Sequence, residues 1–255
     1  MTIDERYSRH VLLKEIGPEG QSRIAQTRVF ILGAGGVGCP AALALAESGV
    51  ASITIVDADA VDISNLPRQI LHTAERVGMN KALSARLTLN AINPNVKVNA
   101  VADFVDEEKI RVLADSCDII IDASDNFRTR HACNRAAKAL RKVLVSASAV
   151  RYSVQLAVFD FRSGNPACYQ CAFPEDDALD VKAAQAGVLA PVTSIAGMMA
   201  AEETLKIAAG AATTSVGSLL LLDTLSWEFS RLKLASDPAC PVCAQYSQSQ
   251  PKACC

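Results

Sequence analysis

The feature that most constrains this chain is a glycine-rich loop between an apolar run and a helical pattern. Residues 29–32 read as a short buried strand, and Gly33, Gly35 and Gly38 follow it in the spacing G-x-G-x-x-G. A loop of this kind at the start of a helix turns free backbone N–H groups toward a phosphate. The segment therefore predicts a nucleotide site.

Asp57 stands where the next apolar run, residues 52–56, ends. A carboxylate at this strand end, about twenty residues after such a loop, commonly accepts hydrogen bonds from a ribose. The alternative is that the glycines only let a helix pack closely on a strand. The loop by itself does not separate ATP from NAD or FAD.

Short apolar runs alternate with longer helical patterns through the first part of the chain, which predicts a Rossmann-like α/β fold with a mostly parallel sheet and helices on both faces. The strands are expected at residues 29–32, 52–56, 96–101, 119–121 and 143–146, and the helices at 37–47, 80–92 and 127–140. Three later runs are expected to extend the sheet as antiparallel strands: residues 153–161, 219–222 and 227–234. The acidic stretch 173–188 is the candidate for a mobile loop.

Charge and hydropathy exclude several classes of protein. The net charge is −2 and lysines and arginines occur singly, so no surface that tracks nucleic acid is expected. Residues 190–209 are apolar, but Glu202, Glu203 and Lys206 interrupt them, which favours a buried helix over a membrane span. The charged N-terminus lacks an export signal, so a cytoplasmic location is expected.

The remaining charged residues favour adenylation over hydride transfer. Arg9, Arg68 and Lys81 are candidate cations for phosphate oxygens, and Asp125 follows a buried strand at the edge where ligands sit. A substrate carboxylate with a pKa of about 3.3 to 3.7 is already ionised and needs no protein base. The absence of a recognisable catalytic triad from the sequence is compatible with this chemistry.

Motifs along nearly the whole chain resemble those of the ubiquitin-activating-enzyme-like proteins of the ThiF, MoeB and HesA type, which are E1-like adenylyltransferases. They are RYSRH at residues 6–10, GAGGVGCP at 33–40, VDADAVDISNLPRQ at 56–69, NK at 80–81, DASDNFRTR at 122–130, AGVLAP at 186–191 and two C-x-x-C pairs. The order of so many motifs makes the resemblance specific.

The resemblance implies a role for each matching residue. Arg9, Arg68, Lys81 and Asp125 would be catalytic, with Arg9 reaching the ATP of the partner subunit in a homodimer and Asp125 binding Mg²⁺. The residues implied to contact the nucleotide are Gly33, Gly35, Gly36, Gly38, Asp57, Asp59, Ser64, Asn65, Arg68, Gln69, Lys81, Asp125 and Asn126. Taken singly, these cations are ordinary surface charges, and Asp125 could be only the cap of the following helix.

The implied reaction is the ATP- and magnesium-dependent adenylation of the C-terminal glycine of a ubiquitin-like sulfur-carrier protein of the MoaD or ThiS kind. Pyrophosphate would leave, and a separate sulfur donor would act next, in a pathway of the molybdopterin or thiamin type. Two alternatives remain open: an oxidoreductase with NAD or FAD in the same loop, and a scaffold that binds a ubiquitin-like protein without activating it.

Four of the nine cysteines form two C-x-x-C pairs some seventy residues apart, Cys168 with Cys171 and Cys240 with Cys243. Their spacing predicts a structural zinc site with four thiolates that clamps the end of the chain to its middle. Reduced thiols or transient disulfides are the alternative.

The other cysteines receive no function. Cys39, Cys117 and Cys133 are interpreted as buried hydrophobic residues. Some relatives of the resembled family carry a reactive loop cysteine where this chain has Ala183, so no covalent intermediate with the carrier is expected there. Cys254 and Cys255 are interpreted as part of an oxidisable tail.

One adenylating domain is expected over residues 1–245, with an N-terminal helical arm and the zinc clamp, followed by a disordered tail at 246–255. The three histidines, His10, His72 and His131, are assigned to packing or helix surfaces. Trp227 is assigned to the core.

Overall fold

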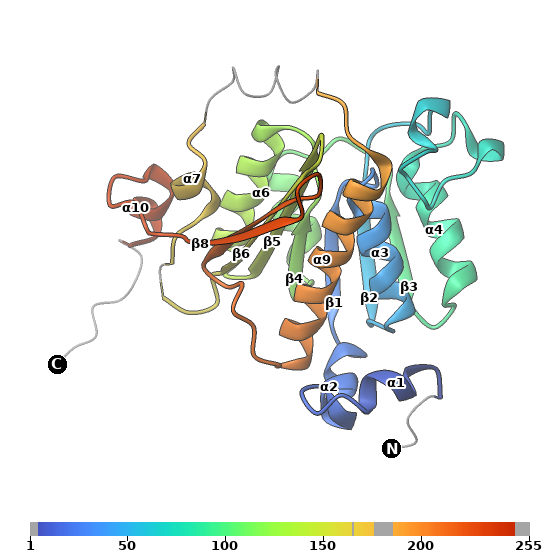
Figure 1. The fold of residues 1–255 in the computed structure, drawn as a ribbon, viewed down its shortest axis with the longest axis horizontal. Helices are drawn as coiled ribbons and strands as arrows, with labels where there is room; N and C mark the ends of the chain where they lie inside the picture. Colours follow the sequence, from blue (N-terminus) through green and yellow to red (C-terminus); the bar gives the residue numbers. More distant parts are fainter. Residues whose placement is uncertain (1–4, 165, 176–185, 248–255) are drawn as a thin grey trace.

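One sheet runs through the molecule (Figure 1) in the computed structural model, which describes residues 5–164, 166–175 and 186–247. The sheet has eight strands in the order β3-β2-β1-β4-β5-β6-β7-β8. Strands β1 to β5 are parallel to one another, and β6, β7 and β8 continue the sheet antiparallel. The strands are β1 Arg28–Leu32, β2 Ser52–Val56, β3 Lys97–Val101, β4 Ile119–Asp122, β5 Val143–Val150, β6 Ser153–Asp160, β7 Ser218–Asp223 and β8 Glu228–Lys233.

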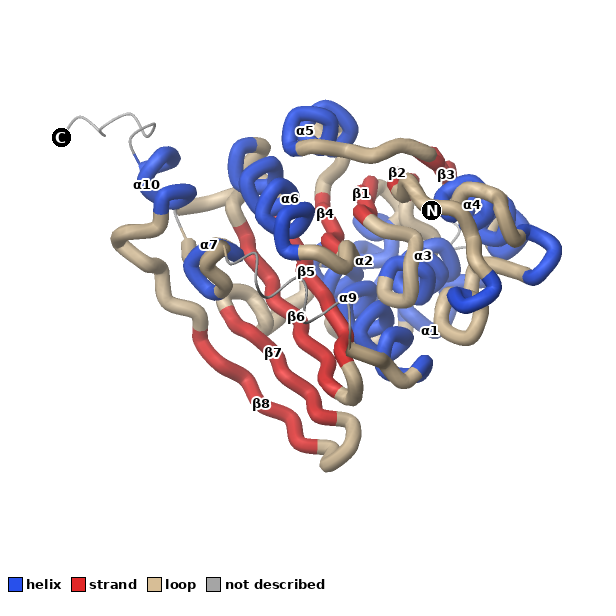
Figure 2. Tube along the Cα trace, turned by 90° about the horizontal axis from the view of Figure 1, so that it is seen from above, coloured by secondary structure: helices blue, strands red, loops and turns tan. Residues whose placement is uncertain are grey.

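Helices cover both faces of the parallel half of the sheet, as Figure 2 shows. Buried residues of α3, α4 and α9 pack on one face, and those of α5 and α6 pack on the other. The helices are α1 Ser8–Val11, α2 Gly17–Ile24, α3 Gly38–Glu47, α4 Lys81–Ile92, α5 Glu107–Ala114, α6 Phe127–Ala139, α7 Tyr169–Ala172, α9 Ala190–Ala209 and α10 Pro241–Ser247.

The predicted fold is confirmed: every expected strand is present within two residues at its start, and the three late strands are antiparallel. Helix α5 had no sequence prediction. It is short, and only Ile110 and Ala114 are buried, so it shows too little of the 3.6-residue period. Asp106 begins it by accepting a hydrogen bond from the N–H of Lys109 at 2.9 Å.

The assignment of Trp227 to the core was wrong. Its side chain is 70% exposed, because it lies in the tight turn between β7 and β8 with a φ of 59°. Of the predicted mobile loop, residues 176–185 lie outside the described residues. Helix α10 continues to Ser247, and the rest of the predicted tail, with Cys254 and Cys255, also lies outside them.

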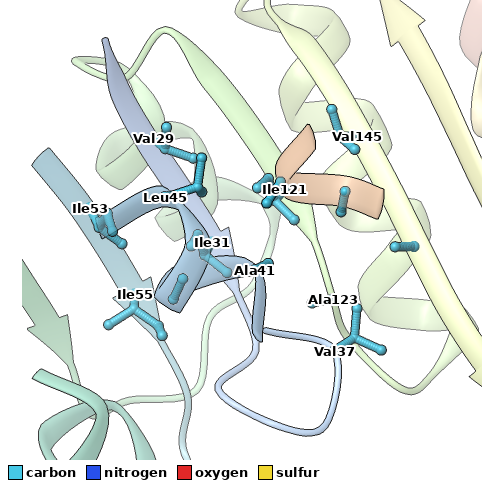
Figure 3. Close-up of a cluster of buried hydrophobic side chains, with 14 of the residues drawn as sticks. Val29, Ile31, Val37, Ala41, Leu45, Ile53, Ile55, Ile121, Ala123 and Val145 are labelled. Carbon is cyan, nitrogen blue, oxygen red and sulfur yellow. The ribbon is translucent and has the colours of Figure 1, made fainter. Parts of the chain in front are cut away.

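Alternate residues of the parallel strands build two hydrophobic cores, one on each face. Val29 and Ile31 of β1 point toward α3, where Leu45 packs against them (Figure 3), while Phe30 belongs to the opposite core. Because both faces are covered, these strands are apolar throughout rather than alternating. This explains the continuous apolar runs in the sequence.

Helix α9 has the bounds that the sequence predicts and crosses α3 at close range. A Cβ on Gly197 would lie 2.3 Å from the carbonyl oxygen of Val37 and 2.5 Å from Cγ of Pro40, so only glycine permits this crossing. The helix ends at Gly210, whose φ is +73°. None of the described helices, α9 included, is long and apolar enough to cross a membrane.

The crossing generates a stability prediction. Replacing glycine by alanine inside a helix usually stabilises by about 0.5 to 1 kcal/mol, but Gly197→Ala is expected to destabilise by about 1 to 3 kcal/mol because the added methyl meets the backbone of α3. Urea unfolding measures the difference. The control is Gly187→Ala, because a Cβ there meets nothing within 4 Å. Equal free energies of unfolding for the two variants would contradict the close crossing.

Candidate functional site

Three segments that the sequence analysis singled out meet at one edge of the sheet. The glycine loop follows β1, Asp57 follows β2, and the segment with Asp125 follows β4. Strand β1 lies between β2 and β4, so these three carboxyl ends are neighbours. The direction of strand order reverses at β1, and ligands of open α/β sheets bind at such a switch point.

The glycine loop is held by contacts that exclude side chains. Gly33 has a φ of +103°, and a Cβ on Gly38 would lie 1.9 Å from the carbonyl oxygen of Gly33. A Cβ on Gly36 would lie 3.0 Å from Cβ of Thr193, so α9 begins directly behind the loop. The free N–H groups at the start of α3 are thereby presented at the edge of the sheet.

Asp57 holds the glycine loop from the neighbouring strand. Its carboxylate accepts hydrogen bonds from the N–H of Ala34 at 2.7 Å and from that of Asp59 at 2.9 Å. Burial raises the pKa of Asp57, while these N–H groups and the charge of Lys81 act in the opposite direction. One carboxylate oxygen is thus engaged by each backbone group, and the carboxylate stays close to a cation.

Lys81 is brought to this site by the start of α4. Its ammonium group lies 2.8 Å from a carboxylate oxygen of Asp59, and its side chain is only 9% exposed, whereas that of Asp59 is 70% exposed. Asn80 caps the helix and also donates to the carbonyl oxygens of Asp57 and Asp59. A largely buried cation therefore stands beside the loop, and its present partner faces solvent.

A turn after β2 carries the polar residues expected to contact phosphate. It begins with a capping box in which Asp62 accepts hydrogen bonds from the N–H and the hydroxyl of Ser64 at 2.8 and 2.6 Å, and Asn65 accepts one from the N–H of Asp62 at 3.3 Å. Arg68 donates to the carbonyl oxygen of Ser64 at 3.0 Å. Asp62 is a residue that the sequence analysis did not single out, and it sets the orientation of Ser64.

Gln69 lies directly beside the glycine loop. Its amide nitrogen would be 3.7 Å from a Cβ on Gly35, and the residue is 4% exposed. Its amide oxygen is buried and has no hydrogen-bond partner among the described residues. A buried acceptor without a donor is costly, so this oxygen marks a place where a polar ligand fits.

The end of β4 carries a buried charge network that sequence analysis missed. Asp122 accepts hydrogen bonds from the hydroxyls of Ser124 at 2.6 Å and Ser146 at 2.9 Å. Arg130 of α6 lies 3.6 Å from the same carboxylate and donates to the carbonyl oxygen of Ser124. The network holds the loop after β4 in place. The only signal in the sequence was that Arg130, in a predicted helix, follows Asp122 by eight residues.

Asp125 is exposed on this loop, next to the glycine loop. Ala123, two residues before Asp125, contacts the glycine loop: its carbonyl oxygen would lie 2.8 Å from a Cβ on Gly33. The cap of α6 is Asn126, whose side chain accepts from the N–H of Thr129 at 2.8 Å and donates to Asp125 at 3.3 Å. The alternative in which Asp125 merely caps the helix is therefore wrong, and its carboxylate stays available at the surface.

Arg9 is not brought to the glycine loop of its own chain. Its helix α1 adjoins Tyr7, whose ring packs against Gly49 at the end of α3 and whose hydroxyl accepts from Asn93 at 2.9 Å at the end of α4. These are the ends of α3 and α4 that lie away from the site, and α1 lies at that end of the molecule in Figure 1.

The four cysteines of the two C-x-x-C pairs converge. Their sulfur atoms lie within 4.8 Å of one another, and four of the distances are 3.5, 3.6, 3.8 and 3.9 Å. A tetrahedral zinc ion with Zn–S bonds of about 2.3 Å would hold its sulfurs about 3.8 Å apart. The cluster therefore has the donor atoms and the spacing that zinc requires.

Helix α6 supplies polar partners to this cysteine cluster. The ammonium group of Lys138, a residue only 4% exposed, lies 3.2 Å from the sulfur of Cys243. Asn134 accepts from the N–H of Tyr169 at 3.0 Å, and a hydrogen bond from its side chain acts to lower the pKa of Cys168, which burial raises. Such groups would offset part of the negative charge of four thiolates.

The other described cysteines are buried, as predicted. Burial raises the pKa of Cys39 to about 12 and that of Cys133 well above its usual value, so neither is a thiolate near neutral pH. Ala183 lies outside the described residues.

An apolar groove of about 620 Å³ adjoins the site on the outer face of α9. Its lining includes Pro67, the neighbour of Arg68 in the chain, and Ile195, Met198 and Met199 of α9. Glu202 is the charged residue in its lining. The groove begins one residue from Thr193, which backs Gly36.

Comparison with known proteins agrees with this geometry. The chain belongs to the ThiF family, whose model matches residues 7–242. It is 35% identical over 240 residues to the molybdopterin-synthase adenylyltransferase of Escherichia coli, covering 94% of this chain and 96% of the relative. It is 38% identical over 244 residues to the sulfur carrier protein adenylyltransferase of Thermus thermophilus, covering 94% and 90%.

A longer relative matches over part of its length. The adenylyltransferase and sulfurtransferase MOCS3 of Anopheles gambiae is 38% identical over 243 residues, and the match covers 94% of this chain but 55% of that protein. The chain thus spans about half of such relatives.

Solved structures share the fold. The crystal structure of E. coli MccB with ATP superposes with a TM-score of 0.83 at 23% identity, over 95% of this chain and 74% of that one. PaaA gives a TM-score of 0.78 at 24% identity, over 91% and 74%.

Proposed function

We propose that this protein adenylates the C-terminal carboxylate of a ubiquitin-like sulfur-carrier protein with ATP. The observation that carries the proposal is the meeting of a glycine loop, a buried cation and an exposed carboxylate at the switch point of the sheet: Gly33 to Gly38, Lys81 and Asp125. The full-length relatives in E. coli and T. thermophilus are named as adenylyltransferases, which supports the same reaction.

The residues of the site fit a nucleoside triphosphate. The N–H groups at the start of α3 would receive phosphate oxygens, and Asp57 would accept hydrogen bonds from the ribose. Lys81, Arg68, Ser64 and Asn65 would lie along the triphosphate. A donor group of the ligand would hydrogen-bond to the buried amide oxygen of Gln69.

Asp125, beside Asn126, would hold Mg²⁺, which neutralises charge on the phosphates when it is bound. The enzyme then needs to align rather than activate the nucleophile, because the carboxylate of the carrier is already ionised. Its attack on the α-phosphorus forms the acyl-adenylate and releases pyrophosphate. Lys81 and Arg68 would stabilise the charge that develops on the phosphates.

The substrate class rests on the relatives. The E. coli relative is named a molybdopterin-synthase adenylyltransferase, and the T. thermophilus relative is named a sulfur carrier protein adenylyltransferase. A carrier of the MoaD or ThiS kind fits both names. The next step would need a sulfur donor from outside this site. A cytoplasmic location would suit the described cysteines, which are all free thiols, because that compartment keeps thiols reduced.

The magnesium assignment is tested at Asp125. Asp125→Ala is expected to lower carrier-dependent exchange of pyrophosphate into ATP at least about a hundredfold, with little change in the unfolding midpoint because the side chain is exposed. Asp118→Ala is the control, since that carboxylate pairs with Arg28 at the far end of β4. Exchange by Asp125→Ala at the rate of this control would contradict the assignment.

We further propose that the four cysteines hold one structural zinc ion. Cys168, Cys171, Cys240 and Cys243 leave no open position, so zinc would join residues 168–171 to α10 and take no part in the reaction. With this clamp, residues 1–245 would form a single unit.

Removal of the metal tests the clamp. Cys240→Ser is expected to bind less than one zinc per chain and to lower the thermal midpoint by about 10 °C or more, because metal binding contributes several kcal/mol to folding. Elemental analysis and calorimetry measure the two effects. Cys117→Ser, at a buried cysteine outside the cluster, should keep one zinc per chain. Full zinc content in Cys240→Ser would contradict a four-thiolate site.

We also propose a homodimer in which Arg9 acts in the site of the partner. Helix α9 supports this, because it joins the two regions that would have to meet. It starts behind Gly36, and at its other end Ala209 accepts a hydrogen bond from Arg23 of α2 at 2.6 Å. Two copies of the apolar groove face of α9, packed antiparallel about a twofold axis, would bring each N-terminal arm to the other site.

Mixing two inactive variants tests action in trans. Arg9→Ala and Asp125→Ala are each expected to be inactive alone. In a mixed dimer one site keeps its own Asp125 and receives Arg9 from the other chain, so random pairing should restore about a quarter of the wild-type activity. Coexpression with two affinity tags isolates the mixed dimer. No recovery in that purified species would show that Arg9 acts within its own chain.

A further inference from the structure

His72 connects three parts of the candidate nucleotide site: the segment after β2, the glycine loop and helix α4. It is 6% exposed and ends the segment that carries Arg68 and Gln69. Its Nε2 lies 2.9 Å from the carbonyl oxygen of Ala34 in the glycine loop, and its Nδ1 lies 3.0 Å from the hydroxyl of Ser84 in α4. The sequence analysis assigned this histidine to packing or a helix surface.

The partners define which nitrogen carries the proton. A carbonyl oxygen can only accept, so Nε2 is protonated and donates to Ala34. Nδ1 is then the acceptor of a hydrogen bond that the hydroxyl of Ser84 donates. Burial lowers the pKa of His72, which favours this neutral form at physiological pH.

The bond to Ala34 controls the direction of the next N–H group. A trans peptide is planar, and its C=O and N–H point in opposite directions. When His72 draws the carbonyl of Ala34 inward, with Cys39 adding a second donor at 3.2 Å, the N–H of Gly35 in the same peptide must point outward. The N–H of Ala34 is itself held by Asp57.

The bond to Ser84 sets the position of the loop relative to α4. Ser84 stands one turn after Lys81, and it is fully buried. The imidazole ring is rigid, so the distance between the two hydrogen bonds cannot change much. The side chain of His72 therefore sets the distance between the glycine loop and the helix that carries Lys81.

We propose that His72 is a positioning residue for the nucleotide: it aims the N–H of Gly35 and spaces the glycine loop from Lys81, so that both meet the same triphosphate. This inference rests on the proposed function, because it needs ATP as the ligand. It gives a role in binding to a residue that touches neither the reacting atoms nor the carrier.

Two conservative variants separate positioning from packing. His72→Gln places an amide donor near the position of Nε2 and keeps the bond to Ala34. His72→Asn reaches only the position of Nδ1, so it keeps the side of Ser84 and loses that of Ala34. Both remain polar and smaller than histidine, and a role in packing alone would make them similar.

Calorimetric titration with ATP and Mg²⁺ gives the readout. We expect Kd for ATP to rise about tenfold or more in His72→Asn and less than about threefold in His72→Gln, while KM for the carrier changes little in either. Leu89→Ala is the control for stability, because Leu89 is fully buried in the last turn of α4, away from the site. It should unfold more easily and bind ATP as the wild type does.

Each other outcome overturns the inference. Equal ATP affinity in His72→Asn and the wild type would show that the bond to Ala34 does not position the loop. Equal losses in the Asn and Gln variants, matched by Leu89→Ala, would reduce His72 to a packing residue. If the wild-type protein binds no ATP, the proposed function fails first, and this inference falls with it.

Discussion

The approach of Gly38 to the carbonyl oxygen of Gly33 is the constraint on which the rest of the site depends. With 1.9 Å between that oxygen and a Cβ at Gly38, only glycine lets α3 start so soon after β1. Because α3 starts so soon after β1, the free N–H groups of its first turn lie at the edge of the sheet. Asp57, the turn after β2 and the loop after β4 then contact a backbone whose position is already defined.

Helix α6 links the candidate nucleotide site to the cysteine cluster. It begins at Asn126 beside Asp125, carries Arg130 to the buried carboxylate of Asp122, and ends near Lys138, which contacts Cys243. This helix of thirteen residues therefore makes a charged contact in its first turn, through Arg130, and another near its end, through Lys138. The cysteine cluster and the candidate nucleotide site thus lie at opposite ends of the same helix and share no residue.

The sequence predicted what depends on local pattern. The buried strands and the glycine loop carry their own periodicity and spacing, and the cysteine pairs carry theirs, so the fold and the convergence of the sulfurs followed. Residues whose role depends on a distant partner were not predictable. Asp122 and His72 look like ordinary strand-end and loop residues until Arg130 and Ala34 are seen beside them. Asp62 was missed although its partner, Ser64, is only two residues away. Trp227 was wrongly assigned to the core because the residue type alone does not distinguish an aromatic side chain in an exposed turn from one in a core.

The most direct test of the account is the mass of the carrier after incubation with this protein, ATP and Mg²⁺. The account predicts that the carrier gains one AMP at its C-terminal glycine and that pyrophosphate appears in equal amount. Hydroxylamine should then convert that end to a hydroxamate. Release of ADP, or AMP attached to a side chain of the carrier, would contradict a site built to join a C-terminal carboxylate to the α-phosphorus of ATP.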